Sequence, residues 1–154
     1  MKQRIVTWNV NGIRSYILDR LPSSKFKKSG VAKEHIAEGS NLHQLIQEVD
    51  PDIICFQETR CSVENMKRIV LPDWKIYASH SEGETNRGPN RYSGVSIWTK
   101  SEPLSWTHRH PLLYDDDVIK PYAKEEGRFL MMEFADFYLI NTYVPNAGSN
   151  YLYR

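Results

Sequence analysis

Short apolar runs separated by polar turns predict a domain built from both strands and helices. Residues 5–8 and 52–57 are apolar and rich in β-branched side chains, and the second run is nearly continuous, as in strands covered on both faces. Between them, the apolar positions of residues 42–49 follow helical spacing. Pro51 is expected to end that helix, because the residue before a proline avoids the α conformation.

The remaining pattern predicts mostly strands. The expected elements are a short helix at 63–70 and strands at 74–79, 95–99, 129–134 and 137–143. The last two strands are expected to pair around a tight turn at Ala135 and Asp136. Segments without regular structure are expected at 15–40, 82–90 and 104–124. This order of elements predicts an α/β fold in which helices layer onto a sheet.

Composition places the chain among ordinary globular domains. Its 154 residues suffice for one domain with a core, and residues 1–154 are expected to form part of a single domain. The formal net charge of +1 does not indicate an independent, strongly basic DNA-binding domain, although cations can still gather on one face.

The two cysteines and the chain's opening predict an intracellular protein. No pair or cluster of cysteines suggests a zinc site, and Cys55 lies in an apolar run, where a buried thiol is expected. No apolar stretch approaches membrane-spanning length, and no apolar signal segment follows Met1, so we expect no membrane association and no secretion.

Polar residues capable of chemistry follow three of the expected strands. They are Asn9 and Asn11, Glu58, and Tyr143 with Asn146. Taken singly, each also fits a turn or surface residue, since asparagine tolerates turn conformations well. Because sheet proteins often place ligands at strand ends, convergence of the three ends would form a site.

Each of these side chains suits phosphate chemistry. Glu58 directly follows an apolar strand, and a Mg²⁺ ion often uses only one or two carboxylates, completed by water and substrate phosphate. Asn9 and Asn11 carry amides that could hold a phosphate oxygen or the water shell of a metal ion. Tyr143 could donate to a phosphate oxygen or transfer a proton, and Asn146 could donate to developing negative charge.

Cationic and hydroxyl side chains lie beside these clusters. Arg14, Arg60 and Arg91 each follow or flank one of them, and a planar guanidinium can bind two phosphate oxygens. Tyr92 and Ser93 add neutral donors next to Arg91. Contacts of this kind would hold a DNA backbone without reading its sequence, whereas an ordinary surface arginine fits any single position equally well.

Five motifs in order give the chain a resemblance to a known family. Residues 8–14, 51–60, 92–95, 126–128 and 141–148 resemble motifs of the exonuclease III family of apurinic/apyrimidinic (AP) endonucleases. The resemblance implies half of a four-layer, DNase I-like α/β sandwich, with a mixed, mostly antiparallel sheet and helices on one face. It also implies Mg²⁺-dependent hydrolysis of double-stranded DNA 5′ to an abasic site, with Mn²⁺ as an alternative ion.

The resemblance assigns roles to the residues singled out above. Glu58 matches the principal metal ligand and Asn11 a position near the metal, while Asn9, Tyr143 and Asn146 match residues of the catalytic site. Positions matching DNA-backbone contacts are Arg14, Arg60, Tyr92 and Ser93. Three departures stand out: Arg60 replaces the usual lysine, Phe56 replaces an aliphatic residue, and Ser149 stands where some relatives carry a DNA-inserting arginine.

The motifs of the family's second half, which supply a water-activating aspartate and a histidine, do not occur in this sequence. We therefore expect the chain to be inactive unless the rest of the same protein, or a complementing chain, completes it. The alternatives are another phosphodiesterase of the same fold and a DNA-binding fragment without catalysis. The resemblance leaves open whether 3′–5′ exonuclease or 3′-phosphodiesterase activity accompanies the endonuclease.

Overall fold

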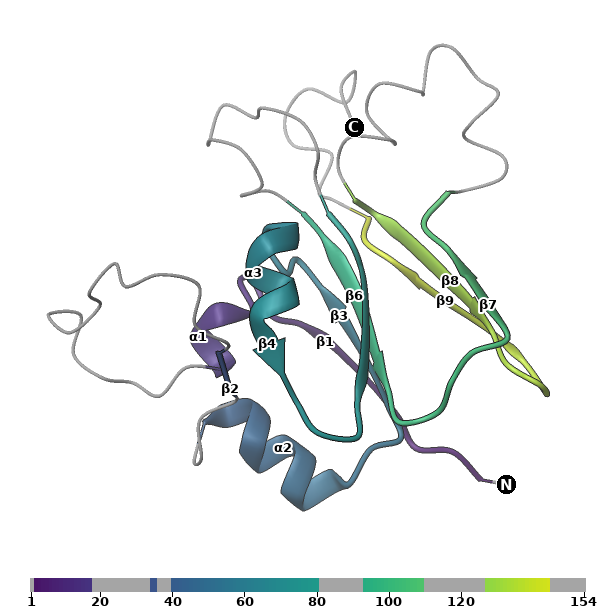
Figure 1. Ribbon diagram of the computed structural model, residues 1–154, viewed down its shortest axis with the longest axis horizontal. Helices are drawn as coiled ribbons and strands as arrows, with labels where there is room; N and C mark the ends of the chain where they lie inside the picture. The colour runs from purple at the N-terminus through teal and green to yellow at the C-terminus, as the bar shows by residue number, and fades with distance from the viewer. Residues whose placement is uncertain (1, 18–33, 36–39, 81–92, 110–126, 145–154) are drawn as a thin grey trace, which may run out of the picture.

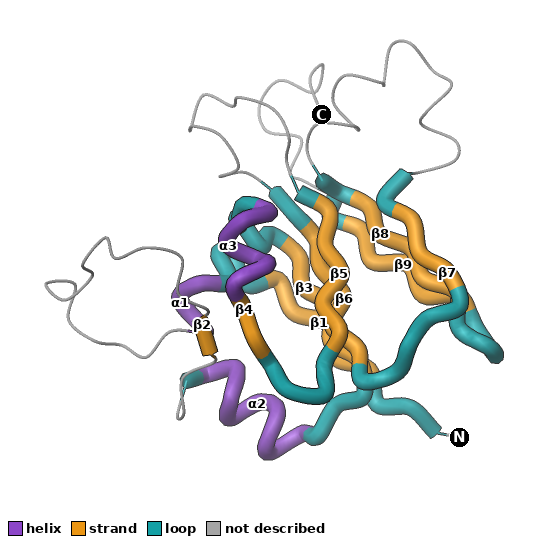
Figure 2. Tube along the Cα trace, viewed as in Figure 1, coloured by secondary structure: helices purple, strands orange, loops and turns teal. Residues whose placement is uncertain are grey.

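The computed structural model describes residues 2–17, 34–35, 40–80, 93–109 and 127–144, and these form three layers (Figure 1). A group of helices covers one face of a four-stranded sheet, and a three-stranded sheet packs against the other face (Figure 2). The expected loop at 82–90 lies outside the described residues, as do most of 15–40 and of 104–124.

The first sheet has the strand order β1-β3-β6-β5. Its strands are β1 (Ile5–Asn9), β3 (Ile53–Gln57), β6 (Val95–Thr99) and β5 (Lys75–Ser79). β1 runs parallel to β3, whereas β6 runs antiparallel to both of its neighbours. The four strands expected from the sequence are confirmed.

The second sheet is antiparallel, with β8 (Phe129–Glu133) between β7 (Ser105–Thr107) and β9 (Tyr138–Thr142). The expected hairpin is confirmed, and Phe134 N–H donates to the Phe137 carbonyl across its turn at 2.9 Å. The expectation of an irregular segment at 104–124 was wrong at β7. Three residues are too few to show an alternating pattern, and β7 exists because it pairs with β8.

The helices are α1 (Arg14–Ile17), α2 (Asn41–Val49) and α3 (Val63–Arg68). The Ser40 side chain caps α2 by accepting from His43 N–H, and the helix ends at Asp50, as expected before Pro51. The helix expected at 63–70 ends earlier, because Ile69–Val70 form β4 and pair with β2 (Glu34–His35). In the described residues, no helix is long and apolar enough to span a membrane.

Strand β3 is covered on both faces, as its apolar run predicted. Ile54 and Phe56 pack with Trp98 in a core beneath the helices. Ile53 and Cys55 pack with residues of β8 in a second core between the sheets. Cys55 is a free buried thiol, and burial raises its pKa to about 11. The predicted fold class, with a mixed and mostly antiparallel sheet and helices on one face, is confirmed.

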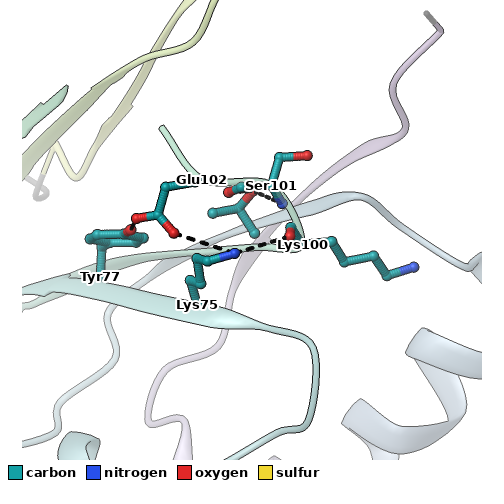
Figure 3. Close-up of polar contacts among 6 residues, drawn as sticks. Lys75, Tyr77, Lys100, Ser101 and Glu102 are labelled. Carbon is teal, nitrogen blue, oxygen red and sulfur yellow. Dashed lines mark hydrogen bonds and ion pairs between the residues drawn. The ribbon is translucent and has the colours of Figure 1, made fainter. Parts of the chain in front are cut away.

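A polar cluster fixes the β5 end of the first sheet (Figure 3). The Tyr77 hydroxyl donates to Glu102 Oε1 at 2.9 Å, and Lys75 Nζ lies 3.3 Å from Glu102 Oε2. Burial, followed by the hydrogen bond and charge of Glu102, raises the pKa of Tyr77 to about 12. Glu102 thereby holds two side chains of one strand in fixed positions.

Tyr77 is expected to make stability depend on alkaline pH. An unfolded tyrosine has a pKa of about 10, whereas the pKa of folded Tyr77 is about 12. Its contribution is therefore complete below the unfolded pKa and is lost as the pH rises through the folded one. Urea unfolding at several pH values measures this effect. Above the pKa of unfolded tyrosine, the free energy of unfolding of wild type should fall relative to that of Tyr77→Phe. A stability difference that stays constant with pH would contradict this assignment.

Candidate catalytic site

Two neighbouring parallel strands bring Asn9 and Glu58 together. β1 and β3 pair in register from Ile5 opposite Ile53 to Asn9 opposite Gln57, so both strands end at the same edge of the sheet. There the Asn9 side-chain amide donates to Glu58 Oε1 at 3.0 Å. The predicted convergence of the first two strand ends is thus a direct contact.

Backbone hydrogen bonds continue the ladder beyond both strands. Val10, Gly12 and Ile13 donate to the carbonyls of Gln57, Glu58 and Thr59 at 3.0, 2.8 and 2.9 Å. On the other side, Thr59 and Arg60 donate to the carbonyls of Gly94 and Ser93, both at 3.0 Å. The segment carrying Glu58 is therefore bound from both sides, although it is a loop.

This loop and its neighbours hold an unusual backbone. Six non-glycine residues of the described chain have positive φ, and four of them lie here: Asn11 (44°), Glu58 (52°), Arg60 (47°) and Ser93 (52°). Each left-handed residue of this kind costs about 1 kcal/mol or more, and it persists only where the surroundings enforce it. The hydrogen bonds on both sides of the loop provide that enforcement and aim Glu58 at the sheet edge.

Gly94 is required for the loop to pack. It has φ of 89°, and a Cβ atom added there would lie 2.4 Å from Thr59 Oγ1. Thr59 is fully buried, and its hydroxyl has no hydrogen-bond partner. The strand β6 therefore reaches the Glu58 loop only because the residue before it lacks a side chain.

Arg60 and Tyr143 complete the surroundings of Glu58. Arg60 Nη2 lies 2.7 Å from Glu58 Oε2, and the two side chains are 33% and 16% exposed. Burial is the largest single influence on the pKa of Glu58 and raises it. Hydrogen bonds from Asn9, Arg60 and Tyr143, together with the charge of Arg60, lower the pKa by more than burial raises it. The pKa of Glu58 is therefore lowered, and the carboxylate stays ionised.

Tyr143 brings the third strand end to the same place. It directly follows β9, its N–H donates to the Arg128 carbonyl at 2.9 Å, and its side chain hydrogen-bonds to Glu58. Asn11 and Arg14 lie exposed in the loop after β1 and at the start of α1. Ser93 is only 1% exposed, and its carbonyl supports Arg60. Arg91, Tyr92 and Asn146 lie outside the described residues.

Sequence reasoning missed a buried amide network beneath these residues. Asn141, 3% exposed, donates to the carbonyls of Phe56 and Ser96 at 2.9 and 3.0 Å. The Gln57 amide donates to Asn141 Oδ1 at 2.6 Å and to Thr7 Oγ1 at 3.0 Å. A polar residue at an inward position of an apolar strand was the available signal for Asn141.

The donor set fits a hard divalent cation. A carboxylate has about four lone-pair positions, and Asn9, Arg60 and Tyr143 use three of those of Glu58. Within the described segments, no group of three histidine, cysteine or acidic side chains could form an all-protein metal cage. One ionised carboxylate beside the Asn9 amide matches Mg²⁺, which uses few protein ligands, retains waters and binds substrate phosphate.

Comparisons with known proteins agree on one family. The chain matches the model of the Endonuclease/Exonuclease/phosphatase family over residues 6–135. It is 30% identical to the DNA repair nuclease APEX1 of Danio rerio, covering 94% of this chain and 37% of that protein. It is 26% identical to a DNA-(apurinic or apyrimidinic site) endonuclease of Dictyostelium discoideum, covering 99% and 33%. The chain thus spans less than half the length of these curated relatives.

Solved structures share the fold. The 3′ phosphatase NExo from Neisseria, bound to a product DNA hairpin, aligns with a TM-score of 0.59 at 22% identity, covering 97% of this chain and 45% of that one. An AP endonuclease from Archaeoglobus fulgidus aligns with a TM-score of 0.52 at 24% identity, covering 94% and 42%. At these identities the likeness establishes the fold alone.

Replacing Gly94 should disrupt the Glu58 loop. Gly94→Ala adds a Cβ that meets Thr59, whereas Gly12→Ala meets nothing within 4 Å, and both positions have positive φ. Gly94→Ala should therefore lower the free energy of unfolding by about 2 kcal/mol more than Gly12→Ala, the usual scale of overpacking. Chemical denaturation of both variants measures the difference, and equal losses would show that the contact is relieved without strain.

Removing the Asn141 amide should loosen the junction of the two sheets. Asn141→Leu keeps the branched shape of the side chain but leaves the Gln57 amide and two buried carbonyls without that partner. We expect a loss of about 2 kcal/mol, the scale for buried polar groups left unsatisfied. Thr7→Val, which removes only the exposed contact to Gln57, is the control. A variant as stable as wild type would contradict a central role for Asn141.

Proposed function

The chain belongs to the endonuclease/exonuclease/phosphatase family, and from this we propose that it carries one part of the catalytic site of a DNA-repair nuclease. The proposed reaction is hydrolysis of the phosphodiester bond 5′ to an abasic site in double-stranded DNA, leaving a 3′-hydroxyl. The observation that carries the proposal is the convergence of three strand ends on the ionised Glu58 carboxylate. The relatives named as endonucleases of apurinic or apyrimidinic sites support the choice of substrate.

Glu58 and Asn11 would hold a Mg²⁺ ion, with Mn²⁺ as an alternative. The bound ion would supply positive charge against the negative charge that develops on the phosphate. Asn9 and Arg60 fix the direction of the Glu58 carboxylate by donating to its two oxygens. Their role is positional, because a metal ligand held in one orientation loses no freedom when the substrate binds.

Tyr143 and the arginines would bind the DNA backbone. The Tyr143 hydroxyl donates its single O–H to Glu58. It therefore lies where it could turn from that carboxylate and donate instead to a phosphate bound beside it. The Arg60 guanidinium has five N–H donors and can keep its bond to Glu58 while it donates to a phosphate. We propose the exposed Arg14 and, outside the described residues, Arg91, Tyr92 and Asn146 as further contacts. Ser93, being buried, would contribute through its backbone.

We also propose that the 154-residue chain is inactive by itself. Hydrolysis needs a group that activates water, and in the described residues no group of three histidine, cysteine or acidic side chains gathers to supply one beside Glu58. Strands β1 and β9 are edge strands, and no described strand pairs with their outer edges. A second polypeptide segment that pairs at these edges would be placed to supply the remaining groups.

The test uses duplex DNA with one abasic analogue and follows 5′ nicking. The chain is assayed alone and with a polypeptide carrying a relative's second half, each with and without Mg²⁺. We expect nicking only in the complemented sample that contains Mg²⁺. Glu58→Gln should slow it by about 100-fold or more, the scale for loss of a catalytic electrostatic group. Glu48→Gln, the same change at an exposed helical position, should leave the rate unchanged.

Other outcomes separate the alternatives. Nicking by the chain alone would contradict the proposed need for a second segment. Salt-sensitive DNA binding without cleavage, in a complex shown to be folded, would favour a non-catalytic DNA-binding role. Cleavage of another phosphodiester, with the abasic substrate left intact, would favour a different phosphodiesterase of this fold.

A further inference from the structure

The β5 edge of the first sheet is open. β5 is the last strand of that sheet and pairs with β6 on one side, and no strand in the described part of the chain pairs with its other side. Alternate residues of an antiparallel strand direct their N–H and C=O groups to opposite sides. Part of the β5 backbone therefore faces outward, as a template for another strand.

A groove follows this edge. It has a volume of about 580 Å³ and is lined by the consecutive residues 76–79 of β5. Met66 and Ile69, from α3 and β4, line one side, and Trp106 of β7 lines the other. Ile76 and Ala78 belong to the core beneath the helices, whereas Tyr77 belongs to the core between the sheets. The groove therefore wraps around the strand edge, and we call it the β5 groove.

The walls of the β5 groove are held in place. The Tyr77 ring packs edge-to-face against Trp106, with centroids 5.4 Å apart, and its hydroxyl is fixed by Glu102 (Figure 3). Charged lysines on edge strands commonly prevent pairing, but Lys75 is ion-paired with Glu102. Trp106 is 47% exposed, a large share for a tryptophan in a folded protein. The groove thus offers aromatic surface without the usual protection of an edge.

The charge of the β5 groove selects among partners. Lys67 lines it together with His80 and His108, whereas the Glu102 carboxylate, which accepts from the Tyr77 hydroxyl, is ion-paired with Lys75. This favours an anionic partner. A peptide can satisfy both the donors and the acceptors of an open strand edge, whereas a nucleic acid cannot continue the ladder. Both features together favour an acidic peptide.

We propose that the β5 groove binds an extended acidic peptide of a partner protein by β-strand addition. The peptide backbone pairs with β5, its apolar side chains contact Trp106 and Tyr77 or Met66, and its carboxylates lie near Lys67 and the two histidines. β6 separates β5 from the strand that leads to Glu58. A peptide paired with the outer side of β5 leaves Glu58 accessible. The groove would therefore recruit a partner to the protein without occupying the proposed catalytic site.

The test measures fluorescence polarisation of a labelled, acetylated peptide of alternating valine and glutamate, about eight residues long to match one strand. The purified chain is titrated without DNA or Mg²⁺, so the result does not depend on the proposed nuclease function. We expect saturable binding. N-methylation of alternate peptide residues removes ladder donors on one edge, so one of the two methylation registers should weaken binding by about tenfold or more. This comparison uses the unaltered protein.

Variants locate the binding site. Trp106→Ala and Lys67→Glu should each weaken binding by about tenfold, as expected for an aromatic anchor and a reversed charge. Lys2→Glu, the same charge change at an exposed position outside the groove, is the control. Circular dichroism and melting temperature establish that each variant is folded.

Four results would overturn the proposal. They are the absence of saturable binding, equal affinity for both methylated peptides and the parent, equal affinity for a glutamine version of the peptide, and unchanged affinity in both folded variants. A single-stranded DNA of eight thymidines is the competing probe. If it binds, if Lys67→Glu abolishes that binding, and if the peptide does not bind, the groove would instead be assigned to a nucleic acid.

Discussion

The buried side-chain amide of Asn141 is the interaction on which the rest of the structure depends. It reaches from β9 in the second sheet to the carbonyls of Phe56 and Ser96 in the first, and it accepts from Gln57. Apolar packing between the sheets is not directional and would tolerate some sliding. The amide bonds fix one register between them, and this register places Tyr143, two residues after Asn141, against Glu58.

The site above this junction combines a rigid sheet with a strained loop. Parallel strands provide two adjacent ends, but the Glu58 carboxylate reaches its position only through left-handed residues that hydrogen bonds hold on both sides. Strain of this kind is commonly concentrated at functional sites, where it fixes groups before a ligand arrives. The same bonds offset the burial of Glu58 and keep it ionised, so one set of contacts determines both its geometry and its charge.

The pattern of apolar residues was enough to predict the elements that are buried on one whole face or on both faces. The run ending at Gln57 is apolar on both faces, and the α2 pattern has a capping serine and a following proline, so both were readable. The positions of Asn9 and Glu58 at strand ends were readable in the sequence, whereas their hydrogen bond was found only in the structure. Strand β7 and the end of α3 were not predictable, because tertiary pairing determines them. The burial of Ser93 leaves no signal in local sequence, since it depends on contacts made across the fold. Arg60 lies only two residues from Glu58, but both residues have a left-handed backbone, which periodicity does not indicate.

The burial of Cys55 makes its reactivity a measure of how often the two sheets separate. The sequence contains two cysteines, and both are buried and outside any disulfide. A thiol with a pKa near 11 is almost wholly protonated at neutral pH, and the protonated form is a poor nucleophile. Alkylating reagents therefore reach Cys55, which lies between the two sheets, only when the sheets separate. The rate of its modification measures how often that separation happens in the native state.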